Sequence, residues 1–472
     1  MATSVARITA VNPATEEVLA TFDAFTAEEV LEAVADAQDA FLGWRERSIA
    51  ERAAPMRRLA ALLRERADRY GRLITLEMGK PITEAKAEIE KCAWGCEHFA
   101  ESAARYLADE VIPTNARRSL VAFEPLGVVL AIMPWNFPFW QVVRFAAPAL
   151  MAGNAAVLKH ASNVPQCALA IEEAVRDAGF PEGLLRAVLI TGSAIEPVIA
   201  DDRIRAVTLT GSSDTGSRIA ELAGRAIKKS VLELGGSDPY IVLADADLDA
   251  AATTGARARN QNTGQSCIAA KRFVAERRIA DDFERKFAKA VEDLVVGDPM
   301  DPRTQIGPLA RRDLVETLER QVDGSVRMGA RVLTGGERLA GKGFFYRPTV
   351  LADVTPDMPV FQQETFGPVA AVLRVRDADE AVRLANESPY GLGASLWTRD
   401  TARGETLARR IESGSVFING LVASDPRLPF GGIKRSGYGR ELGEFGIREF
   451  TNIQTIWVGS AEGPAPKSPP AE

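Results

Sequence analysis

Residues 127–133 read Gly-Val-Val-Leu-Ala-Ile-Met, an apolar run of strand length, and a second run, Ala-Ala-Val-Leu, follows at 155–158 after a helix-length segment. The alternation continues with runs at 186–190, 206–209 and 231–234, and then with a second set at 273–275, 368–375, 394–397 and 415–418. Apolar strands that alternate with helices are typical of a parallel sheet covered on both faces. The pattern therefore predicts an α/β fold with two doubly wound parallel-sheet domains that share a cleft.

The segments that flank these strand runs show other patterns. Apolar residues at three- and four-residue spacing predict helices at 26–43, 48–78 and 82–107. Alternating residues at 111–124, together with Pro113 and Asn115, predict a β-hairpin that projects from the body. The tail, 460–472, is rich in Pro, Ala and Ser, and we expect it to be disordered.

The composition narrows the possible partners and compartment. The 472-residue chain is 46% apolar and 26% charged, with a net charge of −7, which argues against nucleic acid or an anionic membrane as the main partner. Residues 1–10 lack the basic and apolar parts of a signal peptide, and no stretch reaches the roughly 18 apolar residues of a membrane span. Four cysteines in so long a chain form no disulfide framework. We therefore expect a cytoplasmic protein.

Few residues are available for metal or histidine-based chemistry. His98 and His160 are the only histidines, so a Ser-His-Asp or Cys-His mechanism has almost no material. Cys92 and Cys96 lie four residues apart in a helix-like segment, without a second Cys or His pair. We therefore expect them on a core face and predict no metal site.

Cys267 ends the stretch Gln-Asn-Thr-Gly-Gln-Ser-Cys at 261–267. It lies between the two sets of strand runs, so we expect it in the crossover between the domains. A thiol just past a Gly and small polar residues lies where the backbone can turn tightly and place an N–H beside the sulfur, which suits a nucleophile. Taken alone, however, a cysteine is more often a buried small apolar residue.

Polar or glycine-containing motifs follow several of the strand runs. Asn136 lies in Pro-Trp-Asn-Phe-Pro at 134–138, and Glu233 precedes two glycines 34 positions before Cys267. Glu364 begins Glu-Thr-Phe-Gly-Pro-Val, just before a run of the second set. The segment Gly-Ser-Ser-Asp-Thr-Gly at 211–216 opens a helix whose free N–H groups suit a pyrophosphate, although a plain strand-to-helix turn is the alternative.

These motifs, in this order and at these separations, resemble the aldehyde dehydrogenase superfamily from Asn12-Pro13 to Trp457. The resemblance also includes 152–154, Lys159, 179–183, 210–212 and 429–437. It implies a dinucleotide-binding domain (1–110 and 125–235), a catalytic domain (236–435) and an oligomerisation arm with the C-terminal strand (111–124 and 436–459). It also implies a homodimer or homotetramer that acts on a small-molecule aldehyde.

The resemblance implies a covalent mechanism. Cys267 would attack the aldehyde carbon, and the Asn136 amide and the Cys267 N–H would hold the oxyanion. Hydride would pass to a nicotinamide, and Glu233 would activate the water that hydrolyses the thioester. The cofactor-binding positions implied by the family are Trp135, Lys159, Ser162, Thr210, Gly211, Ser212, Leu234, Glu364 and Phe366.

Cofactor choice depends on Ser162, because NAD-preferring members carry a Glu there that repels a 2′-phosphate. The resemblance therefore favours NADP, with NAD still possible. Segments 158–165 and 423–426 resemble NADP-dependent succinate-semialdehyde dehydrogenases, and this likeness implies Arg144, Gln261 and Ser424 as substrate-binding residues. An Arg can pair with a carboxylate in two-pronged fashion and so select a semialdehyde.

Three departures from the family accompany this assignment. Gln261 replaces a carboxylate-binding Arg of certain relatives, Phe145 replaces a common Lys, and Ala269 excludes a second redox-active Cys. Because Phe145 replaces that lysine, a different group must lower the pKa of Cys267. The alternatives are an NAD(P)-dependent dehydrogenase of another aliphatic aldehyde, an enzyme that transfers the acyl group to coenzyme A, and a non-enzymatic nucleotide-binding protein.

Overall fold

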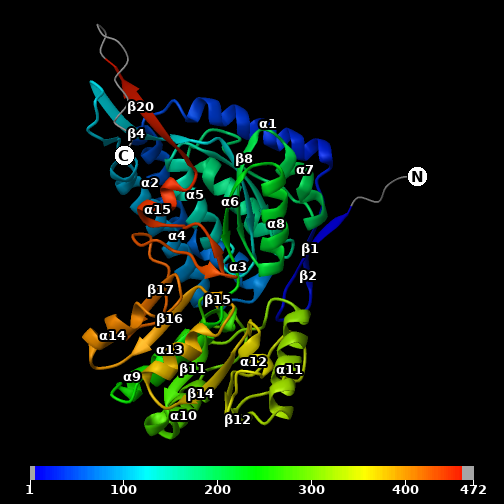
Figure 1. Ribbon diagram of the computed structural model, residues 1–472. Helices are drawn as coiled ribbons and strands as arrows, with labels where there is room; N and C mark the ends of the chain where they lie inside the picture. Colours follow the sequence, from blue (N-terminus) through cyan, green and yellow to red (C-terminus); the bar gives the residue numbers. More distant parts are fainter. Residues whose placement is uncertain (1–5, 460–472) are drawn as a thin grey trace.

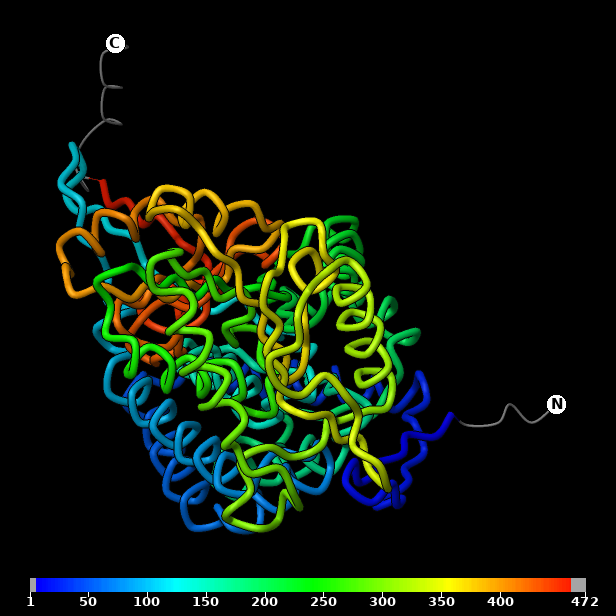
Figure 2. The backbone as a smooth tube through the Cα atoms, turned by 90° about the horizontal axis from the view of Figure 1, so that it is seen from below, coloured from blue at the N-terminus to red at the C-terminus, as the bar shows by residue number. Residues whose placement is uncertain are grey.

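The computed structural model describes residues 6–459, so the tail predicted to be disordered, 460–472, lies outside the described residues. Figure 1 shows two sheet-containing bodies, one above the other, and an arm that projects from the upper body. Figures 1 and 2 both place the arm on the side of the molecule away from the N-terminal strands. Within residues 6–459, no helix combines the length and the apolar character needed to cross a membrane.

The first sheet has six strands in the order β19-β9-β8-β5-β6-β7, all parallel except β19. Its strands are β5 (Val128–Met133), β6 (Ala155–His160), β7 (Leu185–Ala187), β8 (Ile204–Thr210), β9 (Lys229–Glu233) and β19 (Gly437–Tyr438). All residues of β5 are buried, which explains why the run is apolar without alternation. The predicted parallel sheet is confirmed.

Helices cover this sheet and form the upper body. They are α1 (Ala27–Trp44), α2 (Ile49–Glu65), α3 (Ala67–Met78), α4 (Ile82–Tyr106), α5 (Trp140–Met151), α6 (Pro165–Asp177), α7 (Ile195–Ala200) and α8 (Ser213–Arg225). The single helix predicted at 48–78 is two helices, because the backbone leaves helical geometry at Arg66 (φ −100°, ψ 17°). The Arg66 guanidinium donates to the Asp177 carboxylate of α6 at 2.7 Å, which links the start of α3 to that helix.

The second sheet has seven strands in the order β12-β13-β14-β11-β10-β16-β17, with β12 antiparallel. They are β10 (Asp238–Val242), β11 (Ala270–Glu276), β12 (Arg331–Thr334), β13 (Thr349–Ala352), β14 (Val369–Val375), β16 (Gly393–Trp397) and β17 (Ser415–Ile418). Phe273 packs into the core on one face and its neighbour Val274 into the core on the other. The alternation follows from the two-residue period of a strand.

The helices of the lower body cover both faces of this second sheet. They are α9 (Leu248–Asn260), α10 (Arg277–Glu292), α11 (Arg312–Arg327), α12 (Pro359–Gln362), α13 (Ala378–Asn386) and α14 (Thr401–Ala408). Phe283 and Phe287 of α10 pack against Phe273 of β11 on one face, and α11 and α13 contribute to the core that contains Val274 on the other face. The sheet is therefore buried on both sides, as the apolar runs of the second set predicted.

The prediction that Cys267 lies in the crossover between the two domains is wrong. The chain passes from the first sheet to the second between β9 and β10, at residues 234–237. Cys267 lies farther on, in the connection from α9 to β11, both of which belong to the second body. The first strand of the second sheet, β10, has the sequence Asp-Pro-Tyr-Ile-Val, which is not a continuous apolar run. The sequence pattern therefore did not predict this strand, and the crossover was placed too late in the chain.

The arm is a three-stranded antiparallel sheet of β3 (Glu110–Val111), β4 (Arg118–Pro125) and β20 (Thr451–Val458). Between the second sheet and β20, the strand β19 pairs with β9 at the edge of the first sheet, and α15 (Gly443–Arg448) follows it. The segment 436–459 is thus divided between the upper body and the arm. Two small antiparallel sheets are also present in the described fold: β1 (Arg7–Val11) with β2 (Val18–Asp23), and β15 (Tyr390–Gly391) with β18 (Ile433–Lys434).

Candidate active site

A pocket of about 260 Å³, which we call the Trp135 pocket, lies where β5, β8 and β9 end. Its lining includes nine residues singled out from the sequence: Trp135, Asn136, Thr210, Gly211, Ser212, Leu234, Cys267, Glu364 and Phe366. Open α/β sheets bind ligands in crevices at the carboxyl ends of their strands. Gly235, from the glycine pair after Glu233, also lines the pocket, as do Gln141 and Leu314, which were not predicted.

The two remaining cofactor-binding candidates lie outside the lining of the Trp135 pocket. Lys159 pairs with Ile132 of β5 near the end of β6, and Ser162 follows in an exposed turn. Both therefore belong to the same carboxyl edge of the first sheet, on the β6 side. Burial lowers the pKa of Lys159.

The connection from α9 to β11, residues 261–269, is here called the cysteine loop, and it begins with a left-handed turn. Asn262, Thr263 and Gly264 have φ values of 54°, 55° and 73°. This conformation costs a residue with a side chain about 1–2 kcal/mol, so surrounding contacts must hold the turn. A Cβ at Gly264 would lie 2.4 Å from the carbonyl oxygen of Gly367, so the third position requires glycine.

Reciprocal amide contacts join Asn136 to the cysteine loop. The Asn136 Nδ2 donates to the Gln265 carbonyl at 3.0 Å, and the Asn136 carbonyl accepts from the Asn262 Nδ2 at 2.7 Å. The Asn262 N–H donates to the Glu84 carboxylate at 2.7 Å, and the Gln265 Oε1 accepts from the Ala310 N–H at 2.8 Å. One hydrogen of the Asn136 amide nitrogen is therefore used to position the loop, and a second hydrogen is left for a ligand beside Cys267.

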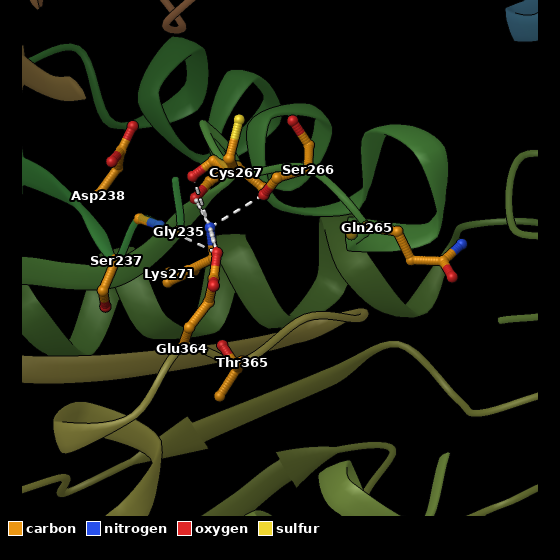
Figure 3. A network of polar contacts seen from close by, with 12 residues as sticks. Gly235, Ser237, Asp238, Gln265, Ser266, Cys267, Lys271, Glu364 and Thr365 are labelled. Carbon is orange, nitrogen blue, oxygen red and sulfur yellow. Dashed lines mark hydrogen bonds and ion pairs between the residues drawn. The ribbon is translucent and has the colours of Figure 1, made fainter. Parts of the chain in front are cut away.

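Lys271 fixes the other end of the cysteine loop and was missed in the sequence analysis. Its buried ammonium donates to the carbonyls of Ser266, Cys267 and Ala269 at 2.9, 2.8 and 3.2 Å. It also lies 3.5 Å from Glu364 Oε1. Figure 3 shows the ammonium between the Glu364 carboxylate and the loop carbonyls, with the Cys267 sulfur pointing away from it. Lys271 thus positions the backbone that carries the thiol.

Glu364 contacts both the segment that follows β9 and the lysine that holds the cysteine loop. Its Oε1 accepts from the Gly236 N–H at 3.0 Å and faces Lys271. A Cβ at Gly236 would lie 2.6 Å from the Cys267 carbonyl oxygen, and one at Gly235 would lie 2.5 Å from Glu364 Oε2. The two glycines after β9 therefore permit the close approach of β9, Glu364 and the cysteine loop.

The acid–base properties of Cys267 and Glu233 are set mainly by burial. Burial raises the pKa of the Cys267 thiol to about 12, although the charges of Arg144 and Lys271 act in the opposite direction. The pKa of Glu233 is raised to about 8, mainly by burial; Arg144 and Arg440 act against this rise, and Glu441 adds to it. Neither carboxylate oxygen of Glu233 has a hydrogen-bond partner among the described residues. These oxygens are buried, and Glu233 is not among the residues that line the Trp135 pocket.

Arg144 lies near the reacting groups, but another carboxylate already occupies it. It is 3% exposed and forms an ion pair with buried Glu441. Its Nη2 donates to Thr210 Oγ1 at 3.2 Å, and its guanidinium carbon lies 4.7 Å from the centre of the Phe430 ring. The positive charge of Arg144 is therefore largely compensated within the protein.

A second pocket, which we call the Ser424 pocket, adjoins Cys267. The three predicted substrate-binding residues line it, and the full lining is Lys91, Phe137, Trp140, Gln141, Arg144, Gln261, Ser266, Cys267, Ile268, Val422, Ala423, Ser424 and Phe430. Exposed Gln261 also borders an open cavity of about 630 Å³ between α4, α9 and α10. Lys91 was not predicted; a lysine beside Cys92 in an Ala-rich amphipathic segment was the available signal.

Known proteins match this sequence over nearly the whole chain. The sequence pattern of the aldehyde dehydrogenase family matches residues 1–456. A probable succinate-semialdehyde dehydrogenase [NADP(+)] of Synechocystis is 52% identical over 96% of this chain and 99% of its own length. Succinate-semialdehyde dehydrogenase [NADP(+)] 1 of Mycobacterium ulcerans is 50% identical over 96% of this chain and its full length.

Solved structures share the fold. The crystal structure of succinic semialdehyde dehydrogenase from Streptococcus pyogenes in complex with NADP+ superposes with a TM-score of 0.94 at 38% identity. The match covers 96% of this chain and 100% of the other. With Cys267 and Asn136 on the wall of one pocket and these matches over nearly the whole chain, this protein belongs to the aldehyde dehydrogenase family.

Proposed function

We propose that this chain is an NADP-dependent succinate-semialdehyde dehydrogenase, which oxidises succinate semialdehyde to succinate. The observation that carries the proposal is that Cys267 lines both the Trp135 pocket and the Ser424 pocket. A nucleotide in the first and an aldehyde in the second would meet at the thiol. The names of relatives about 50% identical over nearly the full chain support the same substrate and cofactor.

In the first chemical step, the sulfur of Cys267 bonds to the aldehyde carbon as the thiol proton passes to solvent water. Negative charge then develops on the former carbonyl oxygen. The remaining Asn136 amide hydrogen and the Cys267 N–H are the donors assigned to this oxyanion, and Asn136 is prepositioned by its contacts with the cysteine loop. A single oxyanion donor typically contributes about 3–4 kcal/mol to transition-state stabilisation.

Glu233 acts in the second step, hydrolysis of the thioester. Its free carboxylate oxygens can accept a proton from water as the water attacks the acyl carbon; the bond from that carbon to the Cys267 sulfur then breaks, which releases the acid and frees the cysteine. With a pKa of about 8, Glu233 is a stronger base than an exposed glutamate and is still partly ionised at neutral pH. This role favours water over coenzyme A as the acceptor of the acyl group.

The described residues fit NADP. Ser212 caps α8, whose first-turn N–H groups have no intrahelical acceptor and suit a pyrophosphate, and glycine at 235 leaves the rim of the pocket without a side chain. Lys159 and exposed Ser162 would hold the 2′-phosphate, since neither repels it. Trp135 and Phe366, with ring centres 5.7 Å apart, would flank the nicotinamide end. When bound, the nicotinamide accepts the hydride from the substrate carbon.

Arg144, Gln261 and Ser424 are assigned to the substrate because all three line the Ser424 pocket. Steady-state kinetics test the assignment. We expect kcat/KM with NADP to be at least tenfold higher for succinate semialdehyde than for butanal, which has the same chain length without the carboxylate. NADP should also be preferred over NAD. Equal kcat/KM values for the two aldehydes would contradict the semialdehyde assignment.

We also propose that the protein is a cytoplasmic homodimer or homotetramer. The arm strand β20 supports an assembly, because its side chains Ile453 and Trp457 are 66% and 43% exposed on a projecting sheet. All four cysteines are free, which is consistent with a reducing compartment. Size-exclusion chromatography with light scattering would give the subunit number, and a monomer at assay concentration would contradict the proposed assembly.

A further inference from the structure

Lys91 is a half-buried cation on the wall of the Ser424 pocket, which also contains Cys267. Its Nζ donates to Ser424 Oγ at 2.7 Å and lies 4.6 Å from the centre of the Trp140 ring. The lysine comes from α4, and Ser424 comes from the loop after β17. The tertiary fold therefore places an ammonium group at a site assigned to the substrate.

Each carboxylate near Lys91 is already bound to another group. Glu88 pairs with buried Lys80 and accepts from the N–H groups of Phe139 and Trp140, both at 2.9 Å. Asp425 accepts from the Arg427 Nε and Nη2 at 2.9 and 2.6 Å.

Lys91 itself has no carboxylate within 4.0 Å in the range 6–459. Arg144, the other cation of the pocket, is paired with Glu441. Lys91 is thus the uncompensated positive charge of the Ser424 pocket.

The Ser424 hydroxyl can only donate a hydrogen bond to a ligand, because its oxygen already accepts two. A serine hydroxyl has two acceptor lone pairs and one proton. Lys91 Nζ and Trp140 Nε1 occupy the acceptor positions, at 2.7 and 3.0 Å. The proton is left over, and no acceptor for it is found in the part of the chain that the structure describes. Lys91 and Ser424 together therefore offer a positive charge and a donor, as a carboxylate requires.

We propose that Lys91 is a specificity-determining residue, which binds the carboxylate of the substrate together with Ser424. This inference rests on the proposed function. It assigns to Lys91, in place of Arg144, the selection of an aldehyde that carries a carboxylate. Arg144 would contact the substrate with its charge already compensated by Glu441, whereas the carboxylate would supply the missing counter-ion of Lys91.

The charged groups around Lys91 should make the substrate preference depend on pH. Burial lowers its pKa to about 8, and the positive charge of Arg144 on α5 acts in the same direction. Glu88 and Cys92 on its own helix and Asp425 on the loop after β17 act in the opposite direction. Lys91 is thus mostly protonated at pH 7 and loses its charge as the pH rises through about 8. The preference for a semialdehyde should decrease over the same range.

The test compares kcat/KM for succinate semialdehyde and butanal, both with NADP, in the parent, Lys91→Met and Lys91→Arg. In Lys91→Met the ratio of the two values should fall by roughly ten- to a hundredfold, mainly through the KM of the semialdehyde, because a charged hydrogen bond is lost. Lys86→Met is the matched control, since Lys86 lies on the same helix with a half-exposed side chain that pairs with Asp68. Its ratio should equal that of the parent.

The pH profile gives a second readout. In the parent, the ratio should decrease above pH 8, whereas in Lys91→Arg it should stay level to pH 10 because a guanidinium remains charged. A Lys91→Met ratio equal to that of the parent would overturn the inference, as would a decrease above pH 8 that persists in Lys91→Arg.

Failure of the proposed function has a different signature. In that case the parent itself would show no preference for the semialdehyde over butanal.

Discussion

The pKa of Glu233 leads to a quantitative prediction about thioester hydrolysis. A base with a pKa of about 8 is mostly protonated at pH 7 and mostly ionised at pH 9. If Glu233 in its ionised form activates the hydrolytic water, the rate constant of deacylation should rise about tenfold between these pH values. An exposed glutamate would give no such change, because it is fully ionised throughout this range.

Rapid mixing of the enzyme with NADP and aldehyde separates the two steps. The burst of reduced nicotinamide reports formation of the thioester, and the later linear phase reports its hydrolysis. In Glu233→Gln the burst should remain and the linear rate should fall by about a hundredfold or more, because the general base is lost. Glu221→Gln is a suitable control, since Glu221 on α8 is exposed, pairs with Arg225 and is not among the groups that act on the pKa of Glu233.

A substitution of Arg144 independently tests whether neighbouring charges set the pKa of Glu233. The positive charge of Arg144 lowers the pKa of Glu233, so Arg144→Met should move the midpoint of the deacylation profile to higher pH. Two results would refute the reasoning: a linear rate that is independent of pH from 7 to 9 in the parent after a clear burst, or a linear rate in Glu233→Gln equal to that of the parent.

Three other substitutions test the remaining parts of the site. Cys267→Ala should abolish dehydrogenation yet still bind NADP in a fluorescence titration; residual turnover would exclude the thiol as nucleophile. Ser162→Glu should shift the NADP/NAD ratio of kcat/KM by about tenfold or more toward NAD through repulsion of the 2′-phosphate, and an unchanged ratio would contradict the cofactor argument. Lys271→Met leaves three buried carbonyls without their donor at about 1–3 kcal/mol each, so kcat and the unfolding temperature should both fall, and parental values of both would show that Lys271 does not position the cysteine loop.

Much of the site could be predicted because it depends on strand ends. Asn136, Thr210 and Leu234 each lie at or just after the end of an apolar run, and parallel strands bring these ends to one edge. The local signals for the runs were strong, since buried strands are apolar throughout. The strand β10 was overlooked because Pro239 interrupts its run, and the position of Cys267 relative to the domains was therefore wrong.

The two lysines show what could not be predicted. Lys91 and Ser424 are 333 positions apart, and no local pattern relates them. Lys271 lies in a strand segment whose neighbours gave no reason to expect that three carbonyls of the preceding loop would converge on its ammonium. In both cases the function of the charge depends on burial and on the absence or presence of a counter-ion, which are properties of the folded environment.

The sequence by itself determined the two parallel sheets, the order of the motifs and the chemical groups available at the cleft, because these depend on local periodicity and on residue type. Only the tertiary structure decided which charges are compensated. It paired Arg144 with Glu441, left Lys91 beside Ser424, and buried Glu233 so that its pKa rises toward 8. Such properties arise from desolvation and from contacts between distant segments, and they exist only once those segments are packed together.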